Sequence, residues 1–149
     1  MKPVQLDAGF SASPQLSPGD VAEASRLGFR SIIVNRPDGE AVGQPPIAAM
    51  EQAAIAAGLG FAAVPIAPGQ ASEADVARFA QALAVLPGPV LGYCRTGTRA
   101  ATLWALAQAG RAESEALIAA GAAAGYDLSG LRPALERRLG TSTSEKQAG

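Results

Sequence analysis

The residue types that could carry out covalent chemistry are concentrated in one segment, Cys94-Arg95-Thr96-Gly97-Thr98-Arg99. Cys94 is the only cysteine among 149 residues, and the sequence contains no histidine. This chain alone therefore lacks the residues for a Cys-His or Ser-His-Asp arrangement, a histidine-ligated zinc site or an intramolecular disulfide. A nucleophilic thiolate at Cys94 would have to be stabilised by backbone N–H groups and by cations.

The segment lies between a predicted buried strand, Val90–Tyr93, and a predicted helix that begins at Ala100. In an open parallel sheet, ligands bind at the carboxyl ends of the strands, and a loop that leads into a helix directs successive N–H groups at a bound anion. We therefore expect Cys94 to be the catalytic nucleophile and Arg99 to hold the anionic group on its sulfur with a bidentate guanidinium fork. The other loop residues are expected to bind or steer the substrate: Arg95, Thr96, Gly97 and Thr98.

A second loop is expected at the same edge of the sheet, because Asn35–Glu40 follows the predicted strand Ser31–Val34. Its Pro-Asp-Gly sequence is typical of a turn. Loops at the carboxyl ends of strands often carry function, so we expect Arg36 or Asp38 to take part directly in substrate binding.

The elements that position these loops follow from local patterns, since short apolar runs predict strands and longer periodic runs that end at Gly predict helices. Two Ser-x-x-Asp sequences, which begin at Ser17 and Ser72, have the spacing of capping boxes at helix starts. The repeating helix-then-strand order favours an α/β fold with a mostly parallel central sheet flanked by helices. Short strands around Gln5–Leu6 and Phe10–Ser13 could add an antiparallel edge to the sheet. Farther along the chain, Gly121 is expected to end the helix that begins at Glu113. The predicted parallel strands are Ser31–Val34, Phe61–Val64 and Val90–Tyr93, and the predicted helices are Pro18–Leu27, Pro46–Ala57, Ser72–Val85, Ala100–Ala109, Glu113–Ala120 and Leu131–Leu139.

Length and composition limit the possible function classes. A chain of this size buries roughly 70% of its unfolded surface, which suits one domain over residues 1–140, with the polar residues 141–149 as a disordered tail or linker. The formal net charge is −1 and the Lys and Arg residues are scattered, so we expect no nucleic acid partner. The first ten residues lack the apolar run of a signal peptide, which indicates a cytoplasmic protein with no membrane partner.

The sequence resembles two known families, one over the short loop that contains the cysteine and the other over longer segments that include this loop. Cys94–Arg99 is similar to the active-site loop of rhodanese-type sulfurtransferases, in which C-R-x-G-x-R surrounds a cysteine that can carry a persulfide. The segments SPQLSPGDVAEASRLGFRSIIVNRPDGE and LPGPVLGYCRTGTRAATLWALAQAG resemble the phosphatase-like domain found with beta-lactamase-like hydrolases, the DUF442 family. This second resemblance implies the three-layer fold of protein tyrosine and dual-specificity phosphatases.

The sequence departs from the phosphatase pattern H-C-x-x-G-x-x-R in ways that bear on the reaction. Four residues instead of five separate Cys94 from Arg99, and Tyr93 stands where the histidine should be. The loop Pro65–Gln70, where these phosphatases carry an aspartic general acid, has no acid. In the family comparison, the shorter loop matches a single terminal sulfur better than a phosphoryl group. The remaining candidate acids lie elsewhere in the sequence: Asp38, Glu73 and Asp75.

We therefore expect a cysteine-dependent sulfurtransferase that holds the transferred sulfur as a persulfide on Cys94 and requires neither a metal nor an organic cofactor. Its expected partners are a small-molecule sulfur donor, or another anionic substrate, and a thiol acceptor. Two alternatives remain open. One is a tyrosine or dual-specificity type of phosphatase that forms a phosphocysteine, and the other is a non-catalytic anion- or thiol-sensing module of a fused or partner oxidoreductase or hydrolase.

Overall fold

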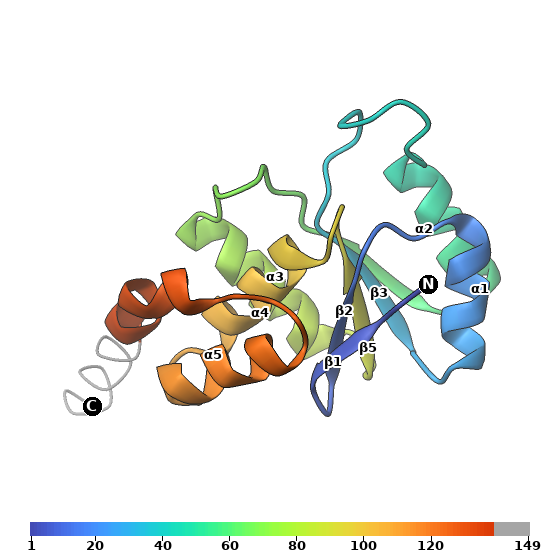
Figure 1. Cartoon of the computed structure of the whole chain (residues 1–149). Helices are drawn as coiled ribbons and strands as arrows, with labels where there is room; N and C mark the ends of the chain where they lie inside the picture. The colour runs from blue at the N-terminus through green and yellow to red at the C-terminus, as the bar shows by residue number, and fades with distance from the viewer. Residues whose placement is uncertain (139–149) are drawn as a thin grey trace.

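The computed structural model, which describes residues 1–138, contains one sheet of five strands: β1 (Val4–Asp7), β2 (Phe10–Ser13), β3 (Ser31–Val34), β4 (Gly60–Ala63) and β5 (Val90–Tyr93). The strand order is β1-β2-β5-β3-β4. All neighbouring pairs are parallel except β1 with β2, which are antiparallel at one edge. Because β5 is the central strand, the loop that follows it opens in the middle of the carboxyl edge of the sheet (Figure 1).

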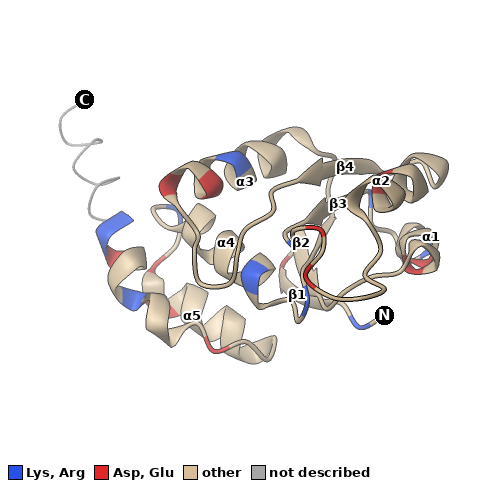
Figure 2. Cartoon of the chain, turned by 90° about the horizontal axis from the view of Figure 1, so that it is seen from above, with Lys and Arg blue, Asp and Glu red and all other residues tan. Residues whose placement is uncertain are grey.

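Helices cover both faces of the sheet: α1 (Pro18–Arg26), α2 (Ile47–Ala56), α3 (Glu73–Val85), α4 (Thr98–Gln108) and α5 (Ser114–Ala123). Helices α1 and α2 lie on one face, and α3 and α4 lie on the other, with α5 beside α4 (Figure 2). Successive strand residues point to opposite faces, so Ile33 joins the core under α3 and α4, whereas Ile32 and Val34 join the core under α1 and α2. The predicted α/β class with a mostly parallel sheet is confirmed.

Local signals in the sequence account for most element bounds. Both predicted capping boxes are present, because the Ser17 and Ser72 hydroxyls each accept the backbone N–H three residues later at 3.1 Å. In return, the carboxylates of Asp20 and Asp75 accept the backbone N–H of Ser17 and Ser72, respectively. The antiparallel edge predicted near the N-terminus is also present, as β1 and β2.

The predicted end of a helix at Gly121 is wrong, since α5 continues to Ala123. Gly121 has a packing role instead of a terminating one. A Cβ at this position would lie 2.5 Å from Leu128 Cδ1, so the glycine lets the segment after α5 fold back closely onto the helix. The positive φ that typically ends a helix occurs at Gly125.

After α5 the chain forms a short 3₁₀ turn, η1 (Ser129–Leu131), and residues 132–138 are helical. The predicted helix Leu131–Leu139 is thus present over its described part, and the predicted tail 141–149 lies outside the described residues. Within residues 1–138, no helix combines the length and apolar character needed to cross a bilayer.

Candidate active site

Cys94 lies at the start of the loop between β5 and α4, where its side chain is buried. The Gly97 backbone N–H donates to Cys94 Sγ at 3.1 Å. Helix α4 begins at Thr98, two residues earlier than predicted, so its N-terminal end is directed at the loop that holds the sulfur. An amide donor and a helix N-terminus both favour negative charge on a nearby group, so the loop places two anion-binding features at the sulfur without an imidazole.

The loop conformation depends on Gly97 and on an aromatic residue from far along the chain. Gly97 is the N-cap of α4 with φ of 95°, a left-handed conformation that side chains disfavour. A Cβ at Gly97 would lie 2.1 Å from the Tyr126 hydroxyl oxygen. That hydroxyl donates to the Thr96 carbonyl at 3.3 Å, so Tyr126 closes one side of the loop.

The charge of Cys94 also acts on the hydroxyl group of Tyr126. Burial, and after it the negative charge of Cys94, raises the pKa of Tyr126, so its hydroxyl stays protonated at neutral pH. Sequence reasoning did not identify this residue, because its only local signal is an aromatic side chain directly after the glycine that follows α5.

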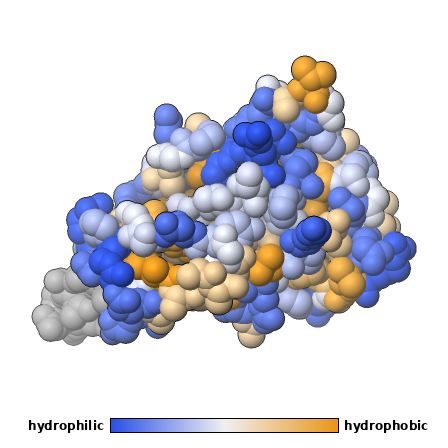
Figure 3. All heavy atoms as spheres, viewed as in Figure 1, coloured by the Kyte–Doolittle hydropathy of each residue, from blue (hydrophilic) through white to orange (hydrophobic). Residues whose placement is uncertain are grey.

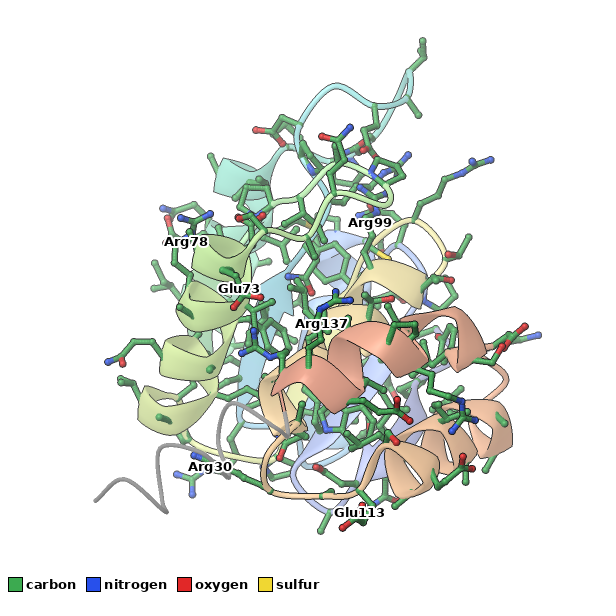
Figure 4. The ribbon with its side chains drawn as sticks, turned by 90° about the vertical axis from the view of Figure 1, so that its left-hand side faces the viewer. Arg30, Glu73, Arg78, Arg99, Glu113 and Arg137 are labelled. Carbon is green, nitrogen blue, oxygen red and sulfur yellow. The ribbon has the colours of Figure 1, made fainter. Side chains whose placement is uncertain are left out.

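Arg99, in the first turn of α4, is buried and tied to the β3–α2 loop (Figure 4). Its Nη1 and Nη2 donate to the two carboxylate oxygens of Glu40, each at 2.8 Å, and Nη1 also donates to the Ile66 carbonyl at 2.9 Å. The hydrogen bond with Glu40, and to a smaller extent the negative charge of Cys94, raises the pKa of Arg99. The guanidinium fork expected to hold an anion on sulfur is thus engaged with Glu40, while the cation still faces the cysteine.

Glu40 is the centre of an ion network at this edge of the sheet. Besides Arg99, it binds Arg36, whose Nε donates to Glu40 Oε1 at 2.8 Å and whose Nη1 donates to Gln15 Oε1 at 3.1 Å. The hydrogen bond from Arg99 is the main reason that the pKa of Glu40 falls to about 2, with Arg36 adding to the effect and burial opposing it. Glu40 is therefore ionised at neutral pH and has no proton to donate.

The predicted loop residues Arg36 and Asp38 have different positions. The Arg36 side chain is buried and reaches the site through Glu40. Asp38 is exposed, and its Oδ1 accepts the Ile47 N–H at 2.8 Å, at the start of α2. Tyr93, in place of the phosphatase histidine, is buried, and burial followed by the charge of Asp38 raises its pKa.

The loop that carries this network extends above the carboxyl edge of the sheet (Figure 1). Its tip is hydrophobic while the surface around it is largely hydrophilic (Figure 3). Val42, in this loop, is fully exposed. The hydrogen bonds of Glu40 and Arg36 tie the base of the loop to the cysteine side of the site.

The segment Cys94–Arg99 forms the cysteine loop. Its exposed residues line a cavity of about 460 Å³. Within the loop, Thr96 and Thr98 share a hydroxyl hydrogen bond of 3.0 Å. The opposite wall is the loop between β4 and α3, and the far end is formed by α4 and by the segment after α5. No carboxylate is among the described lining residues, which are Ile66, Pro68, Gly69, Gln70, Ala71, Arg95, Thr96, Thr98, Arg99, Thr102, Leu106, Leu131 and Ala134.

The remaining candidate acids are engaged elsewhere. Glu73 lies at the start of α3 (Figure 4). Its carboxylate pairs with Arg138. Asp75 accepts the Ser72 N–H of the capping box and pairs with Arg78, and the backbone hydrogen bond from Ser72 lowers its pKa. The described structure therefore brings Arg36 and the cysteine loop together with Glu40, and it gives the three candidate acids structural contacts.

Comparison with known proteins relates this architecture to phosphatases. Residues 4–112 match the family model described as the phosphatase-like domain of beta-lactamase hydrolase-like protein. A beta-lactamase hydrolase-like protein from Agrobacterium fabrum is 37% identical over 140 residues, which are 93% of this chain and 32% of that protein. The chain thus spans about a third of the length of the curated relatives it matches.

Solved structures agree with the family match. A structure from Neisseria meningitidis, described as a "putative phosphatase", is 36% identical, has a TM-score of 0.80 and covers 91% of this chain and 96% of its own. A DUF442 structure from Shewanella putrefaciens with the same description is 15% identical, has a TM-score of 0.64 and covers 96% of this chain and 89% of its own. The predicted phosphatase-like fold is confirmed.

Proposed function

The chain belongs to the family of phosphatase-like domains of beta-lactamase hydrolase-like proteins, and we propose that on this fold it is a cysteine-dependent group-transfer enzyme that moves sulfane sulfur through a persulfide on Cys94. Cys94 is the nucleophile, and the loop amides with Arg99 stabilise the anion on its sulfur. Arg95, Thr96 and Thr98 bind the anionic donor. The acceptor is a thiol.

The observation that carries this proposal is the state of Glu40. This carboxylate contacts the loop arginine, yet Arg99 and Arg36 hold it ionised, with its pKa lowered to about 2. Release of an alkoxide from a phosphate ester benefits by about 10²- to 10⁴-fold from a positioned acid. Sulfite and thiolates are stable anions, so a reaction that releases them suits a site whose carboxylate is ionised.

The transfer balances without a proton donor. The Cys94 thiolate attacks the terminal sulfur of thiosulfate, an S–S bond forms, the S–S bond of thiosulfate breaks, and the electron pair leaves with sulfite. The persulfide anion on Cys94 then presents its outer sulfur to an acceptor thiolate. A new S–S bond forms on the acceptor, and the Cys94 thiolate is released. A covalent intermediate of this kind gives ping-pong kinetics.

Mass spectrometry tests the proposal directly. After incubation with thiosulfate or glutathione persulfide, the chain should gain the mass of one sulfur atom, and a thiol should remove it. Since Cys94 is the only cysteine, Cys94→Ser is a control without background and should gain nothing. Absence of the adduct with every donor, in a protein that remains folded, would refute the assignment.

The second candidate is a phosphatase, which the fold and the 36% identity to a "putative phosphatase" favour. In this reaction the Cys94 thiolate attacks phosphorus, an S–P bond forms, and the P–O bond of the ester breaks as the alkoxide or aryloxide leaves. Water then attacks phosphorus, the S–P bond breaks, phosphate is released and the Cys94 thiolate is restored. A site with an ionised Glu40 should hydrolyse aryl phosphates such as p-nitrophenyl phosphate far faster than alkyl phosphates. Measuring phosphate release and persulfide formation on one preparation, with Cys94→Ser beside it, separates the two reactions.

A further inference from the structure

We propose that the cavity beside the cysteine loop binds the organic part of the sulfur donor, which is a compact organic anion with an apolar body. The inference rests on the proposed function for its reaction and on the cavity for its ligand class. In this protein the donor would be a thiosulfonate or persulfide that carries an aryl or alkyl group.

The size of the cavity is the first argument. Its volume of about 460 Å³ equals about 15 water molecules at roughly 30 Å³ each. It falls in the range of about 300–1,000 Å³ typical of small-molecule sites. An inorganic donor such as thiosulfate would leave most of this space to solvent, so the cavity is large enough for an organic group.

The distribution of polarity is the second argument. The wall formed by the cysteine loop is made of polar residues, namely Arg95, Thr96, Thr98 and Arg99. The guanidinium of Arg99 is shared with Glu40, whereas Arg95 is exposed. The distant walls present apolar side chains, among them Ile66, Leu106 and Leu131. A ligand that satisfies both walls has its negative charge at the loop and its apolar group away from it. No carboxylate is among the described lining residues, and Glu40 binds Arg99 from outside that lining.

The far wall is held in place, so the cavity is formed before a ligand binds. Arg138 donates from Nε to the Leu106 carbonyl at 2.9 Å and pairs with Glu73 on α3. These contacts fasten the helical residues 132–138, which contribute Ala134 to the lining, to both α3 and α4. A preformed apolar wall binds a ligand without the cost of ordering it first.

The reaction with a thiosulfonate, R–SO₂–S⁻, balances in the same way as that with thiosulfate. The Cys94 thiolate attacks the terminal sulfur and forms the new S–S bond. The bond between that sulfur and the sulfonyl sulfur breaks, and its electron pair leaves with the sulfinate R–SO₂⁻. The group R is then the part that the apolar wall binds.

Two donors that differ only in R test the proposal: benzenethiosulfonate and methanethiosulfonate. The measured quantity is the ratio of their kcat/KM values, compared between variants so that intrinsic donor reactivity cancels. Ala134→Phe fills the apolar end and should lower the ratio at least tenfold, because it excludes the phenyl group. Gln70→Phe, on an exposed position of the opposite wall, should also lower it. The matched control Glu136→Phe adds the same side chain to an exposed position of the same helical segment outside the lining, and should leave the ratio unchanged.

Benzenesulfonate, which has no sulfur to transfer, separates the cavity from the reaction. The unmodified chain should bind it in a calorimetric titration, and Ala134→Phe should weaken that binding at least tenfold. A ratio that is equal in all variants, or a lack of benzenesulfonate binding, would overturn the cavity assignment even if the persulfide forms. Binding of benzenesulfonate with no persulfide from either donor would support the cavity and overturn the proposed reaction instead.

Discussion

Replacing Glu40 by Gln tests whether the ion network holds the cysteine loop against the β3–α2 loop. The change keeps the shape of the side chain and removes the negative charge that Arg99 and Arg36 share. Both arginine side chains are at most 9% exposed, so the two cations would lose their counter-charge in a nearly buried position. A carboxyl pKa that falls from 4.5 to about 2 corresponds to at most about 3 kcal/mol of folding free energy at neutral pH. Since the Glu40 side chain is 22% exposed, solvent screening reduces the expected loss to about 1–2 kcal/mol.

The pH dependence gives the prediction its sign. The pKa of Glu40 is lower in the folded state than its ordinary value of 4.5. The stabilisation by ionised Glu40 is therefore fully present above the unfolded pKa and is lost as the pH falls from about 4.5 toward 2. Gln does not titrate, so the stability difference between the unmodified chain and Glu40→Gln should be largest at neutral pH and should shrink through this window.

Urea unfolding at a series of pH values between 7 and 2.5 measures this difference. At neutral pH the midpoint of thermal unfolding should fall by roughly 2–4 °C per kcal/mol. Glu23→Gln is a matched control. Glu23 pairs with Arg26 on α1, and both side chains are well exposed, so the change should cost less than about 0.5 kcal/mol. A Glu40→Gln chain as stable as the unmodified one at pH 7, or a difference that is independent of pH, would refute the role given to the network.

Three further substitutions test the packing around the loop. Gly97→Ala introduces a Cβ 2.1 Å from the Tyr126 hydroxyl oxygen at a φ of 95°, so it should cost more than about 2 kcal/mol and abolish persulfide formation, as measured by unfolding and mass spectrometry. Tyr126→Phe removes the hydrogen bond to the Thr96 carbonyl and should cost about 1 kcal/mol and slow, without abolishing, reaction at the cysteine; an unchanged rate and stability would count against a bracing role. Gly121→Ala places a Cβ 2.5 Å from Leu128 and should destabilise the chain by about 1–3 kcal/mol, whereas a stabilised variant would show that helix propensity outweighs this contact.

The sequence predicted the fold well because its signals are local. Capping boxes, short apolar runs and glycines after helices lie within a few residues of the structure that they specify, and β3 and β5 have the bounds that were predicted. The predicted helix end at Gly121 was wrong because the role of this glycine is set by a contact with a residue outside the helix. Its missing side chain accommodates Leu128, and nothing within the helix itself reveals that contact.

The residues of the candidate site also fall into two groups: those that are neighbours in the sequence and those that only the fold brings together. Cys94 and Arg99 lie in one contiguous motif, so their proximity follows from the loop itself. Glu40 is 59 residues from Arg99 in the chain, and Tyr126 is 30 residues from Thr96. Asp38 and Glu40 are both acids after the same strand, and the pattern of the turn does not tell which carboxylate points to the site. Only the folded loop shows that Asp38 binds the start of α2 and Glu40 binds Arg99.

The charges of the ion network bear on the choice between sulfur and phosphorus. Two guanidinium groups, Arg36 and Arg99, share one carboxylate, Glu40, which leaves one net positive charge in the network. A thiolate or persulfide on Cys94 carries one negative charge and is balanced by it. A phosphocysteine carries up to two negative charges, so it would need a further cation, and the exposed Arg95 is the residue of the loop that can supply one. Neutralising Arg95 should therefore slow phosphoryl transfer more than sulfur transfer, because only the phosphorylated intermediate exceeds the charge that the buried network balances.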